Sequence, residues 1–144
     1  MDDSKKGKAY APLEYEVGRE KIREYANAIG VHAPVHHDRE AAKAAGYRDV
    51  VAPPMFAVVY SAGSVAQGVL DPELGIDLGR MLHGSQEFVW GEPVCSGDTI
   101  TTTTTLADLY ERAGDIPRAR DLFRRVEAHQ PESFEVTHRI RALH

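Results

Sequence analysis

Three things are scarce in this chain: cysteine, unbroken apolar sequence and positive charge. Cys95 is its single cysteine, which excludes an intrachain disulfide and a thiolate zinc site and favours a reducing, cytoplasmic compartment. The longest apolar stretch, residues 50–70, is interrupted by prolines, serines and glycines, so it predicts a buried helix rather than a membrane span. Residues 1–10 carry charges with no apolar segment behind them, which is unlike a signal peptide.

Positive charge is scarce because 17 Lys and Arg stand against 22 Asp and Glu, a formal net charge of −5. A nucleic-acid-binding protein normally has a basic stripe that neutralises phosphates. We therefore expect no nucleic-acid partner and, without an apolar span, no membrane partner. With 144 residues, 42% of them hydrophobic and 27% charged, the chain has the size and composition of one ordinary globular domain.

The spacing of apolar residues predicts the first elements. Residues 1–12 are polar and predict a flexible tail, and residues 13–17 alternate as a short strand does. Residues 19–30 place apolar side chains at i, i+3, i+4 and i+7 before a terminal glycine, which predicts an amphipathic helix. A short helix is expected at residues 39–46, with Asp38 as its N-cap.

The middle of the chain predicts a helix enclosed by a sheet. Residues 55–70 are apolar or small on nearly every side, and a helix without a polar face must be surrounded. Strand-forming residues follow around positions 88–90. The threonine run at residues 99–106 predicts another strand with one hydroxyl face toward solvent, because β-branched residues are poor helix formers.

Beyond residue 106 the apolar residues follow a helical spacing. Asp115 and Ser133 are suitable N-caps, and Pro117 suits the first turn of a helix. The spacing therefore predicts helices through residues 106–144. Residues 106–114 fit either the end of a strand or a first helix.

Four stretches carry a family resemblance: VGREKIREYANAIG, VHAPVHHDREAAKAAGYRDVVAPPMFA, MLHGSQEFVWGEPV and CSGDTITTTTTLADLYERAG. Together they resemble the MaoC-like family of (R)-specific enoyl-thioester hydratases and 3-hydroxyacyl-thioester dehydratases. The resemblance is greatest to the N-terminal-half branch, which includes hydroxyacyl-ACP dehydratase subunits, and it covers about residues 13–114. It implies an α+β hot-dog fold, an antiparallel sheet wrapped round a central helix, with this domain at residues 13–105.

The family's catalytic loop reads G-D-x-N-P-hydrophobic-H, with an alanine six positions further on. The matching positions here are Gly30, Pro34, Val35, His36 and Ala42. Two positions differ: Val31 stands where the family has its acid, and Ala33 where it has asparagine. The resemblance implies His36 as the catalytic residue of a dyad that has lost its acid. Asp38 is an alternative acid, but it is better explained as a helix cap.

The implied reaction adds water to an enoyl thioester or removes it from the 3-hydroxy form. This is acid-base chemistry that needs no cofactor, and histidine suits it because its ordinary pKa of about 6.5 lies near working pH. N–H groups at the start of the buried helix stabilise the thioester oxygen in this family. The implied substrate-binding positions are Pro54, Met55, Phe56, His83 and Gly84.

The C-terminal part resembles one tetratricopeptide repeat over about residues 103–136. The matching positions are Leu106, Ala107, Tyr110, Ala119, Phe123 and Pro131. A single repeat cannot bury its apolar faces alone. We therefore expect a hot-dog fold that lacks its last strands and ends in a helical hairpin at residues 106–144.

Other candidate sites have simpler explanations. Three histidines are close enough in sequence to suggest a metal site: His32, His36 and His37. Pro34 separates them and no carboxylate or cysteine completes a set, so we expect no metal. Cys95 has no adjacent base and predicts an inert thiol. The aromatic residues of the middle region are more typical of a core than of a ligand-binding wall; they are Phe56, Tyr60, Phe88 and Trp90.

A cluster of arginines could form a basic patch for an acyl carrier protein or for the phosphates of CoA: Arg118, Arg120, Arg124 and Arg125. The interleaved Asp121 and Glu127 favour a solvated helix face instead.

Two functional hypotheses follow. The first is a hydro-lyase of fatty-acyl metabolism, an (R)-3-hydroxyacyl-thioester dehydratase or enoyl-thioester hydratase, or a substrate-binding subunit of one. Its substrate would be an acyl-CoA or acyl-ACP, and it would form a homodimer or a heterodimer with a dyad-bearing hot-dog subunit, since exposed sheet edges tend to pair. The second is a non-enzymatic scaffold whose helical C-terminus docks a protein partner.

Overall fold

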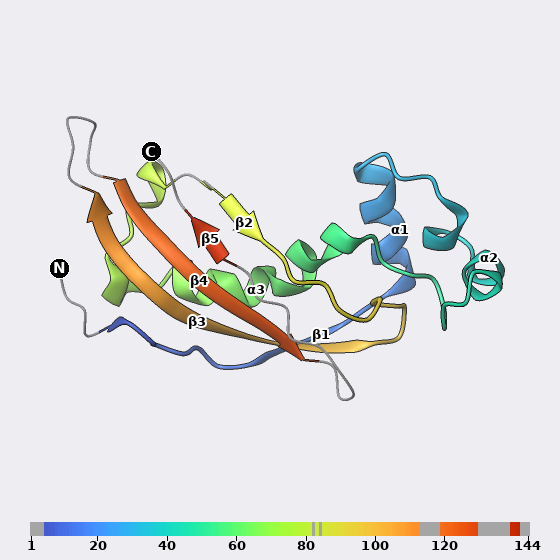
Figure 1. Ribbon diagram of the computed structural model, residues 1–144, viewed down its shortest axis with the longest axis horizontal. Helices are drawn as coiled ribbons and strands as arrows, with labels where there is room; N and C mark the ends of the chain where they lie inside the picture. Colours follow the sequence, from blue (N-terminus) through green and yellow to red (C-terminus); the bar gives the residue numbers. More distant parts are fainter. Residues whose placement is uncertain (1–4, 82, 84, 113–118, 130–138, 142–144) are drawn as a thin grey trace.

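A computed structural model describes residues 5–81, 83, 85–112, 119–129 and 139–141 (Figure 1). The helices are α1 (Arg19–Ala28), α2 (Arg39–Ala44) and α3 (Ala57–Val69), and the short 3-10 turns are η2 (Pro34–His36), η3 (Pro54–Phe56), η4 (Pro72–Leu74) and η5 (Leu78–Arg80). The strands are β1 (Leu13–Glu16), β2 (Ser85–Glu87), β3 (Thr99–Arg112), β4 (Ala119–His129) and β5 (Arg139–Arg141).

The sheet is antiparallel and its central strand is β3. The order is β1-β3-β4, and a second, two-stranded sheet joins β2 to β5. Figure 1 shows β3 and β4 as long curved strands that run beside α3, and α3 contacts β1, β3 and β4. The predicted arrangement of an antiparallel sheet around a central helix is confirmed.

The threonine run forms the inner face of β3, as its alternation predicts. Ile100, Thr102, Thr104 and Leu106 are buried, whereas the residues between them are partly or fully exposed. Successive side chains of a strand point to opposite faces, so burial alternates with period two. The outward face carries the remaining hydroxyls toward solvent, which agrees with the prediction for residues 99–106.

Helix α3 packs inside the fold with mostly small residues and one large one, Tyr60. Its buried positions are Ala57, Tyr60, Ser61, Ser64 and Gly68. The side chains of Ser64 and Thr104 hydrogen-bond at 2.7 Å, which joins the helix to β3 in the buried interior. The helix expected at residues 55–70 is therefore confirmed, although Ala62 and Gly63 are exposed, so the helix is open to solvent along one side.

The other N-terminal helices also match their predictions. The helix expected at residues 19–30 is α1, which ends beside Gly30 in the left-handed conformation (φ 71°) that glycine adopts without strain. Helix α2 has Asp38 as its N-cap: Oδ1 of Asp38 accepts a hydrogen bond from the Ala41 N–H at 2.7 Å.

Residues 7–10, within the segment predicted as a flexible tail, hydrogen-bond to β3. The Gly7 N–H donates to the Leu106 carbonyl, and the Leu106 N–H donates to the Lys8 carbonyl, both at 2.8 Å. The Lys8 ammonium also lies 2.6 Å from a carboxylate oxygen of Asp71, just beyond the end of α3. These contacts hold the segment along the outer edge of the sheet.

The prediction of a helical hairpin and a tetratricopeptide repeat is wrong where the structure describes these residues. Residues 106–112 continue β3, residues 119–129 form β4, and residues 139–141 form β5, so the strands expected to be missing are present. The physical reason is tertiary pairing. β1 covers only the start of β3, and the unpaired backbone groups on the other edge of β3 are satisfied by β4, which overrides the local helical spacing.

The strand expected around residues 88–90 lies slightly earlier, as β2 at Ser85–Glu87. Residues 88–94 form an irregular segment instead. Pro93 has no N–H to donate to a sheet, and the rings of Phe88 and Trp90 stack at a centroid distance of 4.6 Å. Among the residues that the structure describes, no helix is long and apolar enough to cross a membrane.

Candidate active site

A cavity of about 210 Å³ opens between the loop after α1, the start of α3 and the segment before β3. Most of its wall is apolar, and it includes the prolines at the start of α3 together with Phe56, Ala57 and Ile100. Its polar groups come from separate parts of the chain: His36, Tyr47, Tyr60 and Glu92. A largely apolar cavity with a few convergent polar groups is the usual form of a small-molecule site.

His36 is held at the edge of this cavity by main-chain groups. It ends the η2 turn, where its N–H donates to the Ala33 carbonyl at 3.0 Å. Its Nδ1 lies 2.7 Å from the Val51 carbonyl oxygen. Because a carbonyl oxygen can only accept, Nδ1 carries the proton, and in the neutral ring the lone pair is on Nε2. The atom left for proton transfer is therefore Nε2.

The extended segment 50–52 holds the histidine loop in place through main-chain hydrogen bonds. The Val51 N–H donates to the Val35 carbonyl at 3.1 Å, and Val51 bridges to Cys95 in antiparallel fashion. The Ala52 N–H donates to the Val94 carbonyl at 2.7 Å. These bonds bring the histidine loop and the segment before β3 to opposite sides of residues 50–52.

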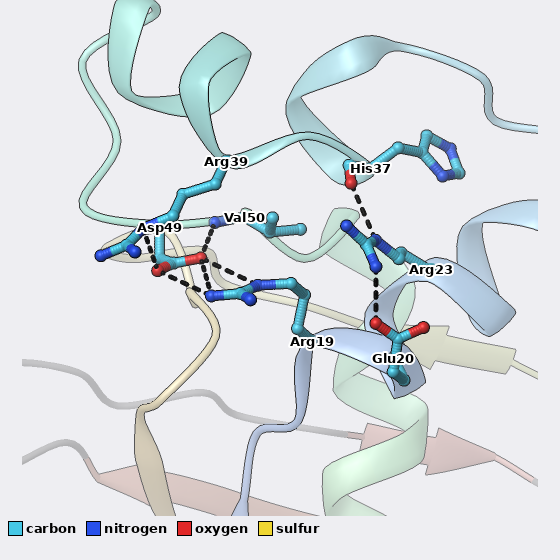
Figure 2. A network of polar contacts seen from close by, with 7 residues as sticks. All are labelled: Arg19, Glu20, Arg23, His37, Arg39, Asp49 and Val50. Atoms are coloured by element: carbon cyan, nitrogen blue, oxygen red, sulfur yellow. Dashed lines mark hydrogen bonds and ion pairs between the residues drawn. The ribbon is translucent and has the colours of Figure 1, made fainter.

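A network of ion pairs and hydrogen bonds around Asp49 connects the start of segment 50–52 to α1 and α2 (Figure 2). Asp49 forms ion pairs with Arg19 of α1 at 3.2 Å and Arg39 of α2 at 3.1 Å, and its Oδ1 accepts from the Val50 N–H at 2.7 Å. The hydrogen bond from the Val50 N–H is the largest cause that lowers the pKa of Asp49 below its ordinary value, and the two guanidinium groups add to it. Arg23 donates to the His37 carbonyl at 2.8 Å, which ties the histidine loop to α1.

The start of α3 offers an electrophilic backbone group. Pro53 and Pro54 have no N–H, so Met55 supplies the first N–H of the η3 turn that leads into the helix. The Phe56 N–H already donates to the Pro53 carbonyl at 2.8 Å. The Tyr25 hydroxyl donates to the Met55 carbonyl at 3.0 Å and so fixes the peptide unit that follows.

Val31 does not line the cavity. Its N–H donates to the Ala26 carbonyl at 2.8 Å, and its carbonyl accepts from Nε2 of His37 at 2.9 Å. Asp38 is occupied as the cap of α2, which agrees with its interpretation as a cap rather than an acid. The one carboxylate among the described lining residues belongs to Glu92. The Val51–Cys95 bridge brings this residue to the cavity, and no pattern in the sequence predicts it.

The remaining sequence-predicted positions fall in different places. Pro54 and Phe56 line the cavity, whereas Met55, between them in sequence, is not among the lining residues and is 43% exposed. His83 is exposed and does not line the cavity, and Gly84 lies outside the described residues. Their roles as substrate-binding residues remain predictions.

The aromatic residues serve both as core and as cavity wall. Phe56 is at the centre of a cluster, with ring centroids 6.2 Å from Tyr15, 5.5 Å from Tyr25 and 6.3 Å from Tyr60. Phe56 and Tyr60 belong to the buried core and also line the cavity, and Trp90 lines it while 49% exposed. The sequence could not separate the two roles because both require large apolar side chains.

Potential metal ligands do not gather in the part of the chain that the structure describes. No group of three His, Cys, Asp or Glu side chains there could hold an ion. His32 is exposed, and the ring nitrogens of His36 and His37 bond to separate main-chain oxygens.

The central helix, the wrapped antiparallel sheet and a cavity at the helix start define a hot-dog fold of the MaoC-like dehydratase class. The chain belongs to the family described as "FAS1-like, dehydratase domain region", whose profile matches residues 4–128. That match spans most of the segment that resembles a tetratricopeptide repeat, which supports the correction made above.

Sequence relatives include a UPF0336 protein from Streptomyces avermitilis, 47% identical over 116 residues, which are 80% of this chain and 77% of the relative. A second UPF0336 protein, from Saccharopolyspora erythraea, is 50% identical over 116 residues, 80% of this chain and 74% of the relative.

Solved structures share the fold along nearly the whole chain. The HadBC (3R-hydroxyacyl-ACP dehydratase) complex from Mycobacterium tuberculosis matches with a TM-score of 0.75, 28% identity and coverage of 96% of both chains. A MaoC-like dehydratase matches with a TM-score of 0.81 and 24% identity, covering 97% of this chain and 42% of the other. The ChsH1-ChsH2 complex, also from Mycobacterium tuberculosis, matches with a TM-score of 0.70 and 17% identity, covering 93% of this chain and 86% of that chain. The last two show the fold alone.

Proposed function

We propose that this chain is the acyl-thioester-binding subunit of a cytoplasmic (R)-3-hydroxyacyl-thioester dehydratase, or of an enoyl-thioester hydratase working in the reverse direction. One observation carries the proposal: His36 is oriented with Nε2 available at an apolar cavity, while Val31 stands where the family has its acid. The chain thus retains a binding site and half of the acid-base pair.

The chemistry explains why half of a pair matters. Dehydration removes a proton from the carbon next to the thioester and expels the 3-hydroxyl as water, so one group accepts a proton and another donates one. Nε2 of His36 can serve one of these steps. Valine at position 31 can neither accept nor donate a proton, so the second step depends on another group.

The thioester oxygen needs stabilisation as charge develops on it. The Met55 N–H, at the positive end of α3, is suited to this role because helix N-termini favour negative charge. An acyl chain would then lie along the apolar wall formed by Phe56, Ala57 and Ile100. No cofactor enters this acid-base reaction.

The missing acid points to a partner. The similar proteins from Mycobacterium tuberculosis are two-chain complexes, HadBC and ChsH1-ChsH2. We propose that this chain pairs in the same way with a second hot-dog subunit that carries an intact acid-histidine dyad. A homodimer in which each chain binds substrate is the alternative arrangement. Fatty-acyl metabolism, with CoA or an acyl carrier protein as the thioester carrier, is the setting in which this reaction belongs.

Crotonyl-CoA hydration tests the proposal. We expect the purified chain to bind crotonyl-CoA without turnover, and to give turnover when mixed with a dyad-bearing hot-dog subunit encoded beside it. Absence of acyl-CoA binding would overturn the proposal. Turnover by the purified chain that disappears in His36→Ala would instead show that the chain is a complete enzyme.

The scaffold hypothesis has lost its basis. It relied on a helical C-terminus, and the described residues of that region are strands. No observation on the described residues favours it as a second function.

A further inference from the structure

The hydroxyl of Tyr60 lies in the interior and has no hydrogen-bond partner among the described residues. Tyr60 is on α3, its side chain lines the His36 cavity, and the residue is only 6% exposed. Among the residues that the structure describes, no donor or acceptor bonds to this hydroxyl. The ring of Phe56 lies beside that of Tyr60, at a centroid distance of 6.3 Å, but a phenylalanine side chain has no polar atom to bond the hydroxyl.

Other buried polar side chains of the described residues are satisfied within the protein. Ser61 donates to the Ala57 carbonyl at 2.6 Å, and Thr102 donates to the Leu13 carbonyl at 3.2 Å. Ser64 and Thr104 bond to each other. Tyr60 is the exception in this part of the chain, and it is also the one that faces the cavity.

A buried hydroxyl without a partner destabilises the folded protein, whereas phenylalanine would fill the same space with no such cost. Burial raises the pKa of Tyr60 to about 12, so the hydroxyl remains protonated at neutral pH and can donate. Ligand-binding sites commonly hold polar groups that are satisfied only when the ligand is bound. The position of this phenol therefore indicates a polar atom on the ligand.

We propose that the Tyr60 hydroxyl is a specificity determinant that hydrogen-bonds the 3-hydroxyl of a short acyl group bound in the His36 cavity. The inference rests on the proposed function and names its substrate class. The thioester oxygen would bind the Met55 N–H, and Met55 lies five residues before Tyr60, in the turn that leads into α3. Each of the two substrate oxygens would then have its own partner.

The size of the cavity limits the length of the acyl group that it can hold. At about 210 Å³ it is somewhat larger than an engineered cavity of about 150 Å³ that holds one benzene molecule. An acyl group of a few carbons fits this space, whereas a long acyl chain would exceed it. The ligand class is accordingly a short 3-hydroxyacyl thioester.

Calorimetric titration of two ligands against two proteins tests the inference. The ligands are (R)-3-hydroxybutyryl-CoA and butyryl-CoA, which differ by the hydroxyl, and the proteins are wild type and Tyr60→Phe. We expect wild type to bind the hydroxylated ligand roughly tenfold more tightly, as one neutral hydrogen bond implies. In Tyr60→Phe this preference should disappear while butyryl-CoA affinity is unchanged.

Two controls separate binding from structure. The melting temperature of ligand-free Tyr60→Phe should equal or exceed that of wild type, because no protein hydrogen bond is lost; a lower value would overturn the inference. Tyr10→Phe is the matched substitution, since the Tyr10 hydroxyl donates to Asp71 at 2.8 Å away from the cavity. It should lower stability and leave the ligand preference intact.

The outcomes distinguish the inference from the proposed function. Equal binding of both ligands to wild type, or the same preference in wild type and Tyr60→Phe, would overturn the role of Tyr60 and leave an acyl-thioester-binding subunit. Failure of wild type to bind either ligand would overturn both.

Discussion

Nδ1 of His36 donates a hydrogen bond to the main-chain oxygen of Val51 across 2.7 Å. A carbonyl oxygen, rather than a carboxylate, therefore orients this imidazole, and it fixes the tautomer without adding a negative charge beside the ring. The Val51 peptide is itself held by Val35 and Cys95. The geometry of the histidine thus depends on backbone contacts between segments distant in sequence.

His36→Asn and His36→Ala separate the two ring nitrogens. The amide of asparagine can replace the Nδ1–H donor to Val51 but supplies no atom at Nε2. We expect Asn to keep stability within about 0.5 kcal/mol of wild type and Ala to lose about 1 kcal/mol, as one hydrogen bond is worth. Both variants should lower turnover in the reconstituted complex to the same extent, because each removes Nε2. Urea unfolding and crotonyl-CoA hydration measure the two effects, and turnover unchanged in Asn would exclude Nε2 as an acid-base atom.

Val31→Asp restores the acid that the family pattern has at this position. Wild type alone is expected to give no turnover, whereas we expect the variant alone to hydrate crotonyl-CoA at least tenfold above the background rate, because a carboxylate can share the proton transfers with His36. Val31→Asn has a similar size without the acid and is the control. Equal rates for Asp and Asn would contradict the view that the missing acid limits this chain, and His36→Ala should remove any gained activity.

Asp49→Asn and Asp49→Ala test the carboxylate network shown in Figure 2. Asparagine retains an acceptor for the Val50 N–H but loses the charge that pairs with Arg19 and Arg39. Because these arginines are partly exposed and screened by solvent, we expect Asn to cost about 1 kcal/mol and Ala about 2 kcal/mol in unfolding free energy. Chemical denaturation checks the order, and an Ala variant as stable as Asn would show that the Val50 bond contributes nothing.

Asp71→Asn removes an acid-sensitive contact. Hydrogen bonds from Lys8, and then from Tyr10, lower the pKa of Asp71 to about 2 in the folded protein. A carboxyl whose pKa is lower in the folded state stabilises the protein above its unfolded-state pKa of about 4, and this stabilisation is lost as the pH falls from about 4 to 2. Melting temperatures measured across this window should therefore fall less steeply in Asp71→Asn than in wild type. Parallel curves would rule out a coupling between Asp71 and Lys8.

Ser64 and Thr104 can be tested as a pair. Ser64→Ala leaves the Thr104 hydroxyl buried without its partner, and Thr104→Val leaves the Ser64 hydroxyl in the same condition. Each single change should cost about 1–3 kcal/mol in unfolding free energy, while the double variant should cost less than the sum of the two. Strict additivity in urea unfolding would show that the two hydroxyls do not interact in the folded protein.

Local pattern was sufficient for the elements that depend on local chemistry. The spacing of apolar residues and the terminal Gly30 predict α1, the side chain of Asp38 predicts the start of α2, and the threonine run predicts the inner strand β3. Each of these signals acts over a few residues, so no knowledge of distant partners is needed. The loop that carries His36 was identified by resemblance for the same reason.

Long-range contacts account for what the pattern missed. β4 has an apolar spacing that also suits a helix, and only pairing with β3 decides between them. Glu92 and Tyr47 reach the cavity because residues 50–52 pair with residues 94–96, a contact with no signature in either segment alone. The lone hydroxyl of Tyr60 likewise follows from what surrounds it and not from its place in the sequence.

The pairing of β1 with β3 affects how the protein folds during its synthesis. Leu13 and Thr102 are opposite each other in the sheet but 89 residues apart along the chain. A ribosome that adds about 5–20 residues per second needs several seconds to bridge that interval, and non-local pairing also slows folding. During that time β1 has no strand to pair with. We therefore expect the His36 cavity to form only late in synthesis, and until then the incomplete sheet is open to a partner subunit or a chaperone.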